Sequence, residues 1–85
     1  MSNTYFFTNP MHCHPCRKQD KVIEDNAIKG LITADIATEE GCILATKFRL
    51  RGGLPCFIKV DENDNVLKEW EGTMTADGLR AFMED

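Results

Sequence analysis

Hydrophobic and polar positions alternate along this chain in short blocks that predict seven secondary-structure elements. Blocks rich in β-branched and aromatic residues are typical of strands, and apolar residues that recur at helical spacing are typical of helices. The predicted strands span residues 4–8, 31–36, 55–60 and 66–70, and the predicted helices run from 13 to about 28, from 38 to 50, and from 75 onward. Gly30 and Gly52–Gly53 are expected to end the first two helices, and Thr38 and Thr75 to begin the last two.

The resulting order, β-α-β-α-β-β-α, indicates one α/β domain that spans residues 1–85. Polar residues 61–65 separate the last two strands and predict an antiparallel hairpin. The first three strands are joined by helices, so we expect them to run parallel or to switch direction once. The predicted architecture is a four-stranded mixed sheet with helices on both faces. The helix residues expected to contact this sheet are Val22, Ile23, Ala27, Ile28, Ile43, Leu44, Phe48, Leu50, Leu79, Phe82 and Met83.

Composition and charge are those of a soluble globular protein. The chain has 85 residues, of which 42% are hydrophobic and 28% are charged, and its net charge is −4. An acidic chain is a poor partner for nucleic acid, and no apolar run approaches the roughly 20 residues of a membrane span. Residues 1–7 lack the basic and small-residue pattern of a signal peptide. We therefore expect a cytoplasmic protein without nucleic-acid or membrane partners, and nothing in the pattern requires more than a monomer.

Two of the four cysteines lie close together, in the segment Cys13-His14-Pro15-Cys16 at the predicted start of the first helix. Residues three positions apart in a helical turn have Cα atoms about 5 Å apart, within the range that a disulfide requires. Cys13 would be the N-cap, where unpaired N–H groups and the helix dipole stabilise a thiolate. Cys16 would be covered by the helix, and Pro15 fits the first turn because its missing N–H costs nothing there.

These positions predict different roles for the two sulfur atoms. Cys13 is the expected nucleophile that attacks a substrate disulfide, and Cys16 is the expected resolving cysteine that releases the reduced product. His12 and His14 flank Cys13, and an imidazolium beside the sulfur would lower the pKa of Cys13 further. The alternative is that both histidines are ordinary exposed loop residues.

A metal site is the main competing interpretation of the cysteines. The potential ligands are His12, Cys13, His14, Cys16, Cys42 and Cys56. Structural zinc sites usually have a second closely spaced pair, which this chain lacks, and three adjacent residues do not readily converge on one tetrahedral centre. A c-type haem would need histidine directly after Cys16, where Arg17 stands. We therefore expect no metal or haem cofactor. Cys42 is expected to lie in the core, and for Cys56, which follows Pro55 at a strand start, the core is favoured over a position near the Cys13–Cys16 turn.

Three segments together resemble the thioredoxin/glutaredoxin family. The Cys13–Cys16 turn follows a hydrophobic strand and opens a helix, as the C-x-P-C turn of the family does. Residues 45–55 are similar to the thioredoxin segment that leads into its cis-proline, and residues 71–83 are similar to the C-terminal glycine, turn and helix. The resemblance implies a minimal thioredoxin fold with a cis peptide between Leu54 and Pro55, placed against the disulfide.

The resemblance also implies a substrate site around the disulfide. The backbone of Leu54, next to the cis-proline Pro55, would form hydrogen bonds with a substrate peptide. The other residues expected to contact substrate are His12, Pro15 and Gly72.

The chain departs from the family pattern at three places. Phe7 stands where thioredoxins have a buried carboxylate, and His12 replaces the tryptophan that usually precedes the first cysteine. Gly72-Thr73 is a poor substitute for the Gly-Gly-x-Asp segment that binds glutathione in glutaredoxins. Thiol release must therefore depend on His14, on water, or on another base.

The predicted function is the reduction of protein disulfides in the cytoplasm, with the chain as an electron carrier for enzymes such as ribonucleotide reductase. The resemblance implies thioredoxin reductase or glutathione as the electron donor, and the missing glutathione-binding segment favours thioredoxin reductase. Compact family members of this kind occur in bacteriophages. The alternatives are a glutathione-dependent glutaredoxin, or a non-catalytic metal-binding or protein-binding module of the same fold.

Overall fold

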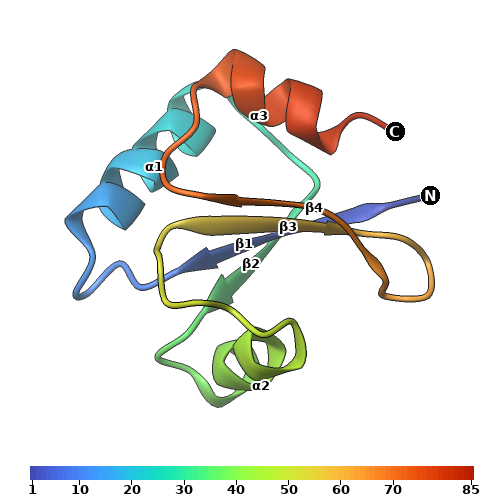
Figure 1. Cartoon of the computed structure of the whole chain (residues 1–85). Coiled ribbons are helices and arrows are strands. Elements are labelled where there is room, and N and C mark those ends of the chain that lie inside the picture. Colours follow the sequence, from blue (N-terminus) through green and yellow to red (C-terminus); the bar gives the residue numbers. More distant parts are fainter.

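The computed structural model describes all 85 residues and contains the seven predicted elements in the predicted order (Figure 1). The strands are β1 (Asn3–Thr8), β2 (Leu31–Asp35), β3 (Cys56–Val60) and β4 (Val66–Glu71). The helices are α1 (His14–Asp25), α2 (Glu39–Lys47) and α3 (Ala76–Met83). None of these helices is both long enough and apolar enough to cross a lipid bilayer. The predicted α/β class with a mixed four-stranded sheet is confirmed.

The sheet has the strand order β2-β1-β3-β4, and only β3 runs opposite to the other three strands. Phe7, near the end of β1, is opposite Cys56 at the start of β3. Cys56 is in turn opposite Glu71 at the end of β4. The chain segments that follow β1, precede β3 and follow β4 therefore meet at one end of the sheet.

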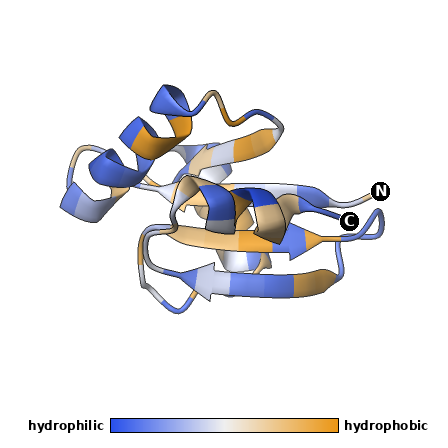
Figure 2. Cartoon of the chain, turned by 90° about the horizontal axis from the view of Figure 1, so that it is seen from above, coloured by the Kyte–Doolittle hydropathy of each residue, from blue (hydrophilic) through white to orange (hydrophobic).

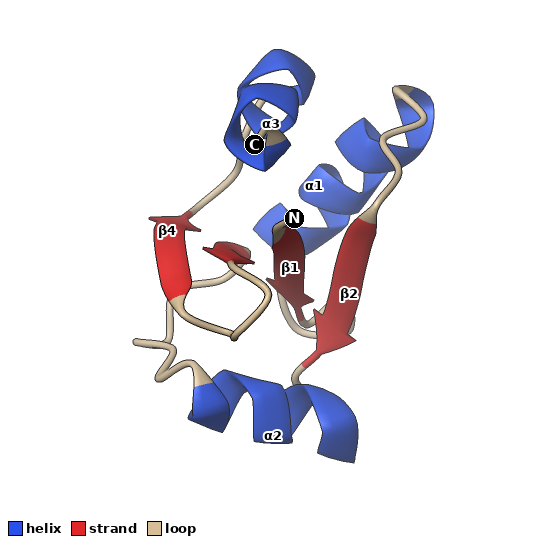
Figure 3. Ribbon diagram, turned by 90° about the vertical axis from the view of Figure 1, so that its right-hand side faces the viewer, coloured by secondary structure: helices blue, strands red, loops and turns tan.

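Helices α1 and α3 cover one face of the sheet, and α2 covers the other (Figure 1, Figure 3). Because side chains alternate along a strand, β1 and β3 contribute to the core on both faces. The buried core residues on the α2 side are Phe7, Ala34, Phe48, Cys56, Ile58 and Val60, and those on the opposite side are Phe6, Phe57 and Leu79. Figure 2 shows that β3 is mostly hydrophobic, whereas the edge strand β4 is largely hydrophilic.

Helix α1 ends at Asp25, before the predicted end near residue 28, and Gly30 does not terminate it. Asn26 is the C-cap, and its backbone N–H and side-chain Nδ2 donate to the carbonyl of Val22 at 3.2 and 2.9 Å. Ala27 then takes a left-handed conformation with a φ of 50°, which turns the chain out of the helix. Ala27 is exposed as a result, so the expectation that it contacts the sheet is wrong.

Helix α2 also ends early, at Lys47 rather than at Leu50. Phe48 is its C-cap, and Arg49 follows in a left-handed conformation with a φ of 54°. The N–H of Leu50 then donates to the carbonyl of Ala45 at 3.0 Å, which closes the turn. Phe48 and Leu50 still pack into the core as predicted, but they do so from the turn and not from the helix.

The side of α2 that faces the sheet is marked by Gly41 and Leu44. A Cβ atom at Gly41 would overlap the backbone carbonyl of Asp35 at the end of β2, so the close approach of α2 requires glycine. At about 100° per residue, Cys42 and Ile43 are each turned at least 100° away from both Gly41 and Leu44. Both side chains are exposed. The expectations that Cys42 is buried and that Ile43 contacts the sheet are therefore wrong.

Candidate functional site

The Cys13–Cys16 segment forms the first turn of α1, as predicted. Cys13 is the N-cap, with an extended backbone (φ −129°, ψ 104°), and the N–H of Cys16 donates to the Sγ of Cys13 at 3.2 Å. The two cysteines form a disulfide, and their Cα atoms are 5.2 Å apart. Pro15 lies in this first turn, where it removes an N–H that would have no partner within the helix.

The two sulfur atoms differ in burial. Cys16 is fully buried, whereas Cys13 is partly exposed. A partner molecule can therefore reach Cys13 but not Cys16. Because Cys13 also lies at the positive end of the helix dipole and its Sγ receives the N–H of Cys16, the fold favours a negative charge on Cys13 once the disulfide is opened.

Both histidines beside Cys13 are exposed, and Arg17 contacts one of them. Arg17 Nη1 donates to the carbonyl of Pro10 at 2.8 Å, and Nη2 is 3.4 Å from Nδ1 of His14. Because arginine has only donors, Nδ1 of His14 can only act as the acceptor in this contact. Arg17 was not among the predicted site residues, although positions three apart are neighbours on a helix. The contribution of His12 and His14 to the reactivity of Cys13 remains a prediction.

Two of the predicted substrate-binding loops, which contain Pro55 and Gly72, are hydrogen-bonded to each other. They lie at the end of the sheet where β1 leads into the loop that carries Cys13. The Leu54–Pro55 peptide is cis, as the resemblance implied, and Pro55 is fully buried. The N–H of Gly72 donates to the carbonyl of Pro55 at 2.7 Å, and the φ of 108° at Gly72 favours glycine. Leu54 is partly exposed, and Pro15 is exposed on α1. The contact of these residues with substrate remains a prediction.

A buried glutamine connects α1 to the segment that follows β4. Gln19 is fully buried, and its Nε2 donates to the carbonyl of Met74 at 3.1 Å. The N–H of Met74 donates in return to Oε1 of Gln19 at 2.6 Å. Gln19 was missed in the sequence. The sequence feature that indicates its burial is its position three residues after Cys16, because this spacing places both side chains on the buried side of the helix.

The end of β1 has no carboxylate at the position that thioredoxins use. Phe7 belongs to the core on the α2 side, so its side chain lies on the sheet face opposite to α1. Because side chains alternate along a strand, the side chain of Thr8 lies on the α1 side of the sheet. Its Oγ1 and the Oδ1 of Asn9 are both buried without a hydrogen-bond partner. Two buried polar oxygens without hydrogen-bond partners therefore lie at the start of the loop that leads to Cys13.

The remaining two cysteines are free and are not part of this site. Cys42 is exposed on α2, and Cys56 is buried in the core as predicted. Burial raises the pKa of Cys56 to about 11, and the nearby carboxylates of Glu71 and Glu69 add to the shift. No group of three or more His, Cys, Asp or Glu side chains is placed where it could hold a metal ion.

Solved structures resemble this chain, whereas no protein-family model and no curated protein matches it. Thioredoxin-2 of the malaria parasite superposes with a TM-score of 0.75 at 20% identity, over 98% of this chain and 81% of that one. StoA from Bacillus subtilis superposes with a TM-score of 0.72 at 17% identity, over 99% of this chain and 83% of that one. A thioredoxin from Thermus thermophilus superposes with a TM-score of 0.69 at 21% identity, over 94% of this chain and 69% of that one.

These matches establish that the chain has the thioredoxin fold. At 17–21% identity they show the arrangement of the backbone and nothing more specific. The fold and the disulfide with C-x-x-C spacing at the start of α1 together indicate a thiol–disulfide oxidoreductase in general terms.

Replacing Gln19 with leucine should destabilise the protein by about 2–3 kcal/mol, because the N–H and carbonyl of Met74 lose their partners. The neighbouring variant Lys18→Leu changes an exposed side chain and should stay within about 0.5 kcal/mol of the parent. Urea unfolding followed by far-UV circular dichroism measures both. Equal stability of the two variants would contradict the role given to Gln19.

In the oxidised native protein, iodoacetamide at pH 8 should modify Cys42 and leave Cys56 unmodified. With a pKa of about 11, only about one Cys56 thiol in a thousand is ionised at this pH, and the side chain is also buried. Mass spectrometry should therefore find a single adduct, and Cys42→Ser should have none until the protein is unfolded. Rapid modification of Cys56 in the folded Cys42→Ser variant would show that the site is open.

Proposed function

We propose that this protein reduces protein disulfides through Cys13 and Cys16. The observation that carries the proposal is the position of Cys13 as N-cap of α1, where the N–H of Cys16 points at its Sγ from 3.2 Å. The same turn buries Cys16 and leaves Cys13 accessible. An accessible sulfur that is stabilised as a thiolate is what thiol–disulfide exchange requires of its attacking group.

The proposed cycle moves two electrons from the protein to its substrate. The Cys13 thiolate attacks one sulfur of a substrate disulfide, and the other substrate sulfur leaves as a thiolate and takes up a proton. The Cys16 thiolate then attacks the Sγ of Cys13 in this mixed disulfide. The second substrate thiolate leaves, and the Cys13–Cys16 disulfide forms. Cys16 must lose a proton before its attack, and we expect water or His14 to accept it.

We expect an enzyme such as ribonucleotide reductase to be the substrate, in the cytoplasm, with the protein acting as a monomer without a bound cofactor. Thioredoxin reductase is the favoured electron donor, and glutathione is the alternative. Gly72-Thr73 is a poor match to a glutathione-binding segment, and this supports the first donor. Reduction of the disulfide by glutathione but not by thioredoxin reductase with NADPH would favour a glutaredoxin.

The two cysteines should give different results when they are replaced one at a time. Cys13→Ser should abolish the reduction of insulin disulfides, because the attacking sulfur is lost. Cys16→Ser should accumulate a mixed disulfide with substrate, visible on a non-reducing gel, because no second sulfur resolves it. Cys42→Ser should retain nearly full activity, since Cys42 lies on α2, outside the site. Full activity of Cys13→Ser would reject the proposal and favour a binding module of the same fold.

The reactivity of Cys13 should also depend on pH in a characteristic way. In the reduced protein, its alkylation rate should rise with a midpoint below pH 8, because the helix N-terminus stabilises the thiolate. Mass spectrometry resolves Cys13 from the other thiols in the same sample, so Cys42 provides an internal reference. A midpoint at the ordinary value for cysteine, about 8.5, would remove the main support for the proposed mechanism.

A further inference from the structure

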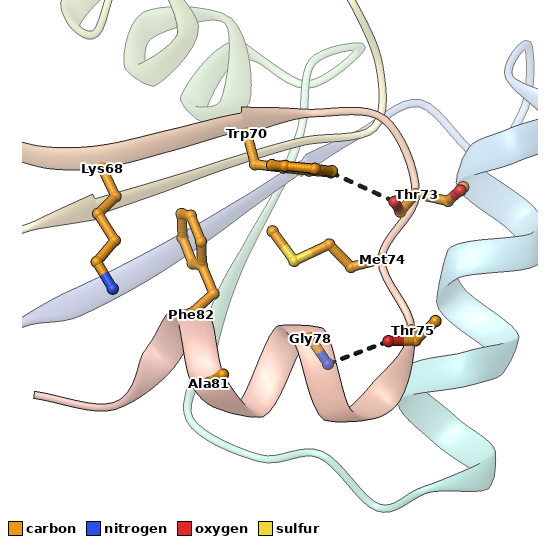
Figure 4. Close-up of a pocket in the computed structure, with 8 residues that line it drawn as sticks. All are labelled: Lys68, Trp70, Thr73, Met74, Thr75, Gly78, Ala81 and Phe82. Carbon is orange, nitrogen blue, oxygen red and sulfur yellow. Dashed lines mark hydrogen bonds between the residues drawn. The ribbon is translucent and has the colours of Figure 1, made fainter.

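A groove lies between the edge strand β4 and helix α3, beyond the segment that carries Gly72 (Figure 4). Its volume is about 490 Å3, within the range of ligand sites in proteins. Trp70, Met74 and Phe82 form its apolar walls, and the small residue Ala81 on α3 helps to keep it open. The indole Nε1 of Trp70 donates to the carbonyl of Thr73 at 3.3 Å, so the ring is held in place.

The charge of the groove is opposite to that of the protein. The chain has a net charge of −4, yet the only charged residue that lines the groove is Lys68. Lys68 forms no ion pair, and its Nζ lies 5.7 Å from the centre of the Phe82 ring. The groove therefore complements a ligand that has a large apolar group and one negative charge.

The strand beside the groove is open to an additional strand. β4 pairs only with β3, and all six of its residues are exposed. Its outer N–H and carbonyl groups therefore have no partner in the sheet. Lys68 and Trp70 are two residues apart on β4, and both line the groove. Every second side chain of an added strand would therefore lie on the same side of the sheet as these two residues.

We propose that β4 and this groove bind an extended peptide segment that adds to the edge of the sheet. In an antiparallel arrangement, a large apolar residue lies opposite Trp70, and an acidic residue two positions later lies opposite Lys68. The segment thus has the pattern apolar-x-acidic. The site uses neither sulfur atom of the disulfide, so this proposal can be tested independently of the redox function.

A second copy of this chain is a poorer occupant than such a peptide. Two β4 strands related by a twofold axis perpendicular to the sheet would pair around a single residue that faces its own copy. Centring the pair on Lys68 places two lysines opposite each other, and centring it on Glu69 does the same with two glutamates. Like charges directly opposite are destabilising, and other centres shorten the overlap.

Trp70 is the only tryptophan in the chain and is half exposed, so its fluorescence reports directly on the groove. The probes are the capped peptides Ac-Thr-Leu-Thr-Glu-Thr-Val-NH2 and its counterpart with lysine in place of glutamate. The parent protein should bind the acidic peptide about five-fold more tightly, with a saturable blue shift in emission. Lys68→Glu should reverse this preference, because the charge opposite the variable residue is inverted.

Lys21→Glu on α1 makes the same change in net charge away from the groove and should keep the preference of the parent protein. An unchanged preference in Lys68→Glu would overturn the proposal, as would emission that no peptide shifts at millimolar concentration. A blue shift that develops with protein concentration alone, together with a dimer in sedimentation, would identify a second copy as the occupant and would also overturn it.

Discussion

The N-terminus of α1 is the constraint on which the candidate site depends. The helix begins one residue after Cys13, so the sulfur of Cys13 takes the cap position and receives the N–H of Cys16. The same geometry turns Cys16 inward, where no solvent reaches it. Two properties that thiol–disulfide exchange needs, an accessible stabilised sulfur and a protected second sulfur, thus follow from where a single helix starts.

Two sets of hydrogen bonds hold the other segments of the site in place. Gly72 donates to the carbonyl of Pro55 and joins the loops that flank β3 and β4, and Gln19 bonds to both backbone groups of Met74. Hydrogen bonds from Gln19 therefore attach α1 to the segment between Gly72 and the groove beside β4. The redox turn and the proposed peptide site use different residues, and Gln19 links the helix of the first to Met74 of the second.

Local patterns predicted the elements well and their ends less well. The capping hydroxyls of Thr38 and Thr75 and the Cys13 cap are signals within a few residues of the helix they begin, and each is confirmed. Both glycine stop signals were misleading. The first two helices end instead where non-glycine residues, Ala27 and Arg49, adopt left-handed conformations that hydrogen bonds to the last turn hold in place.

The order of strands and helices, the first turn of α1 and the spacing of its cysteines all arise from residues close together in the chain, so they were readable without a structure. Which side of α2 faces the sheet was decided by the approach of Gly41 to Asp35, and this left Cys42 in solvent. The pairing of Gln19 with Met74 likewise joins residues far apart in the chain. Such contacts depend on how elements pack, and no local pattern of hydrophobic and polar residues encodes them.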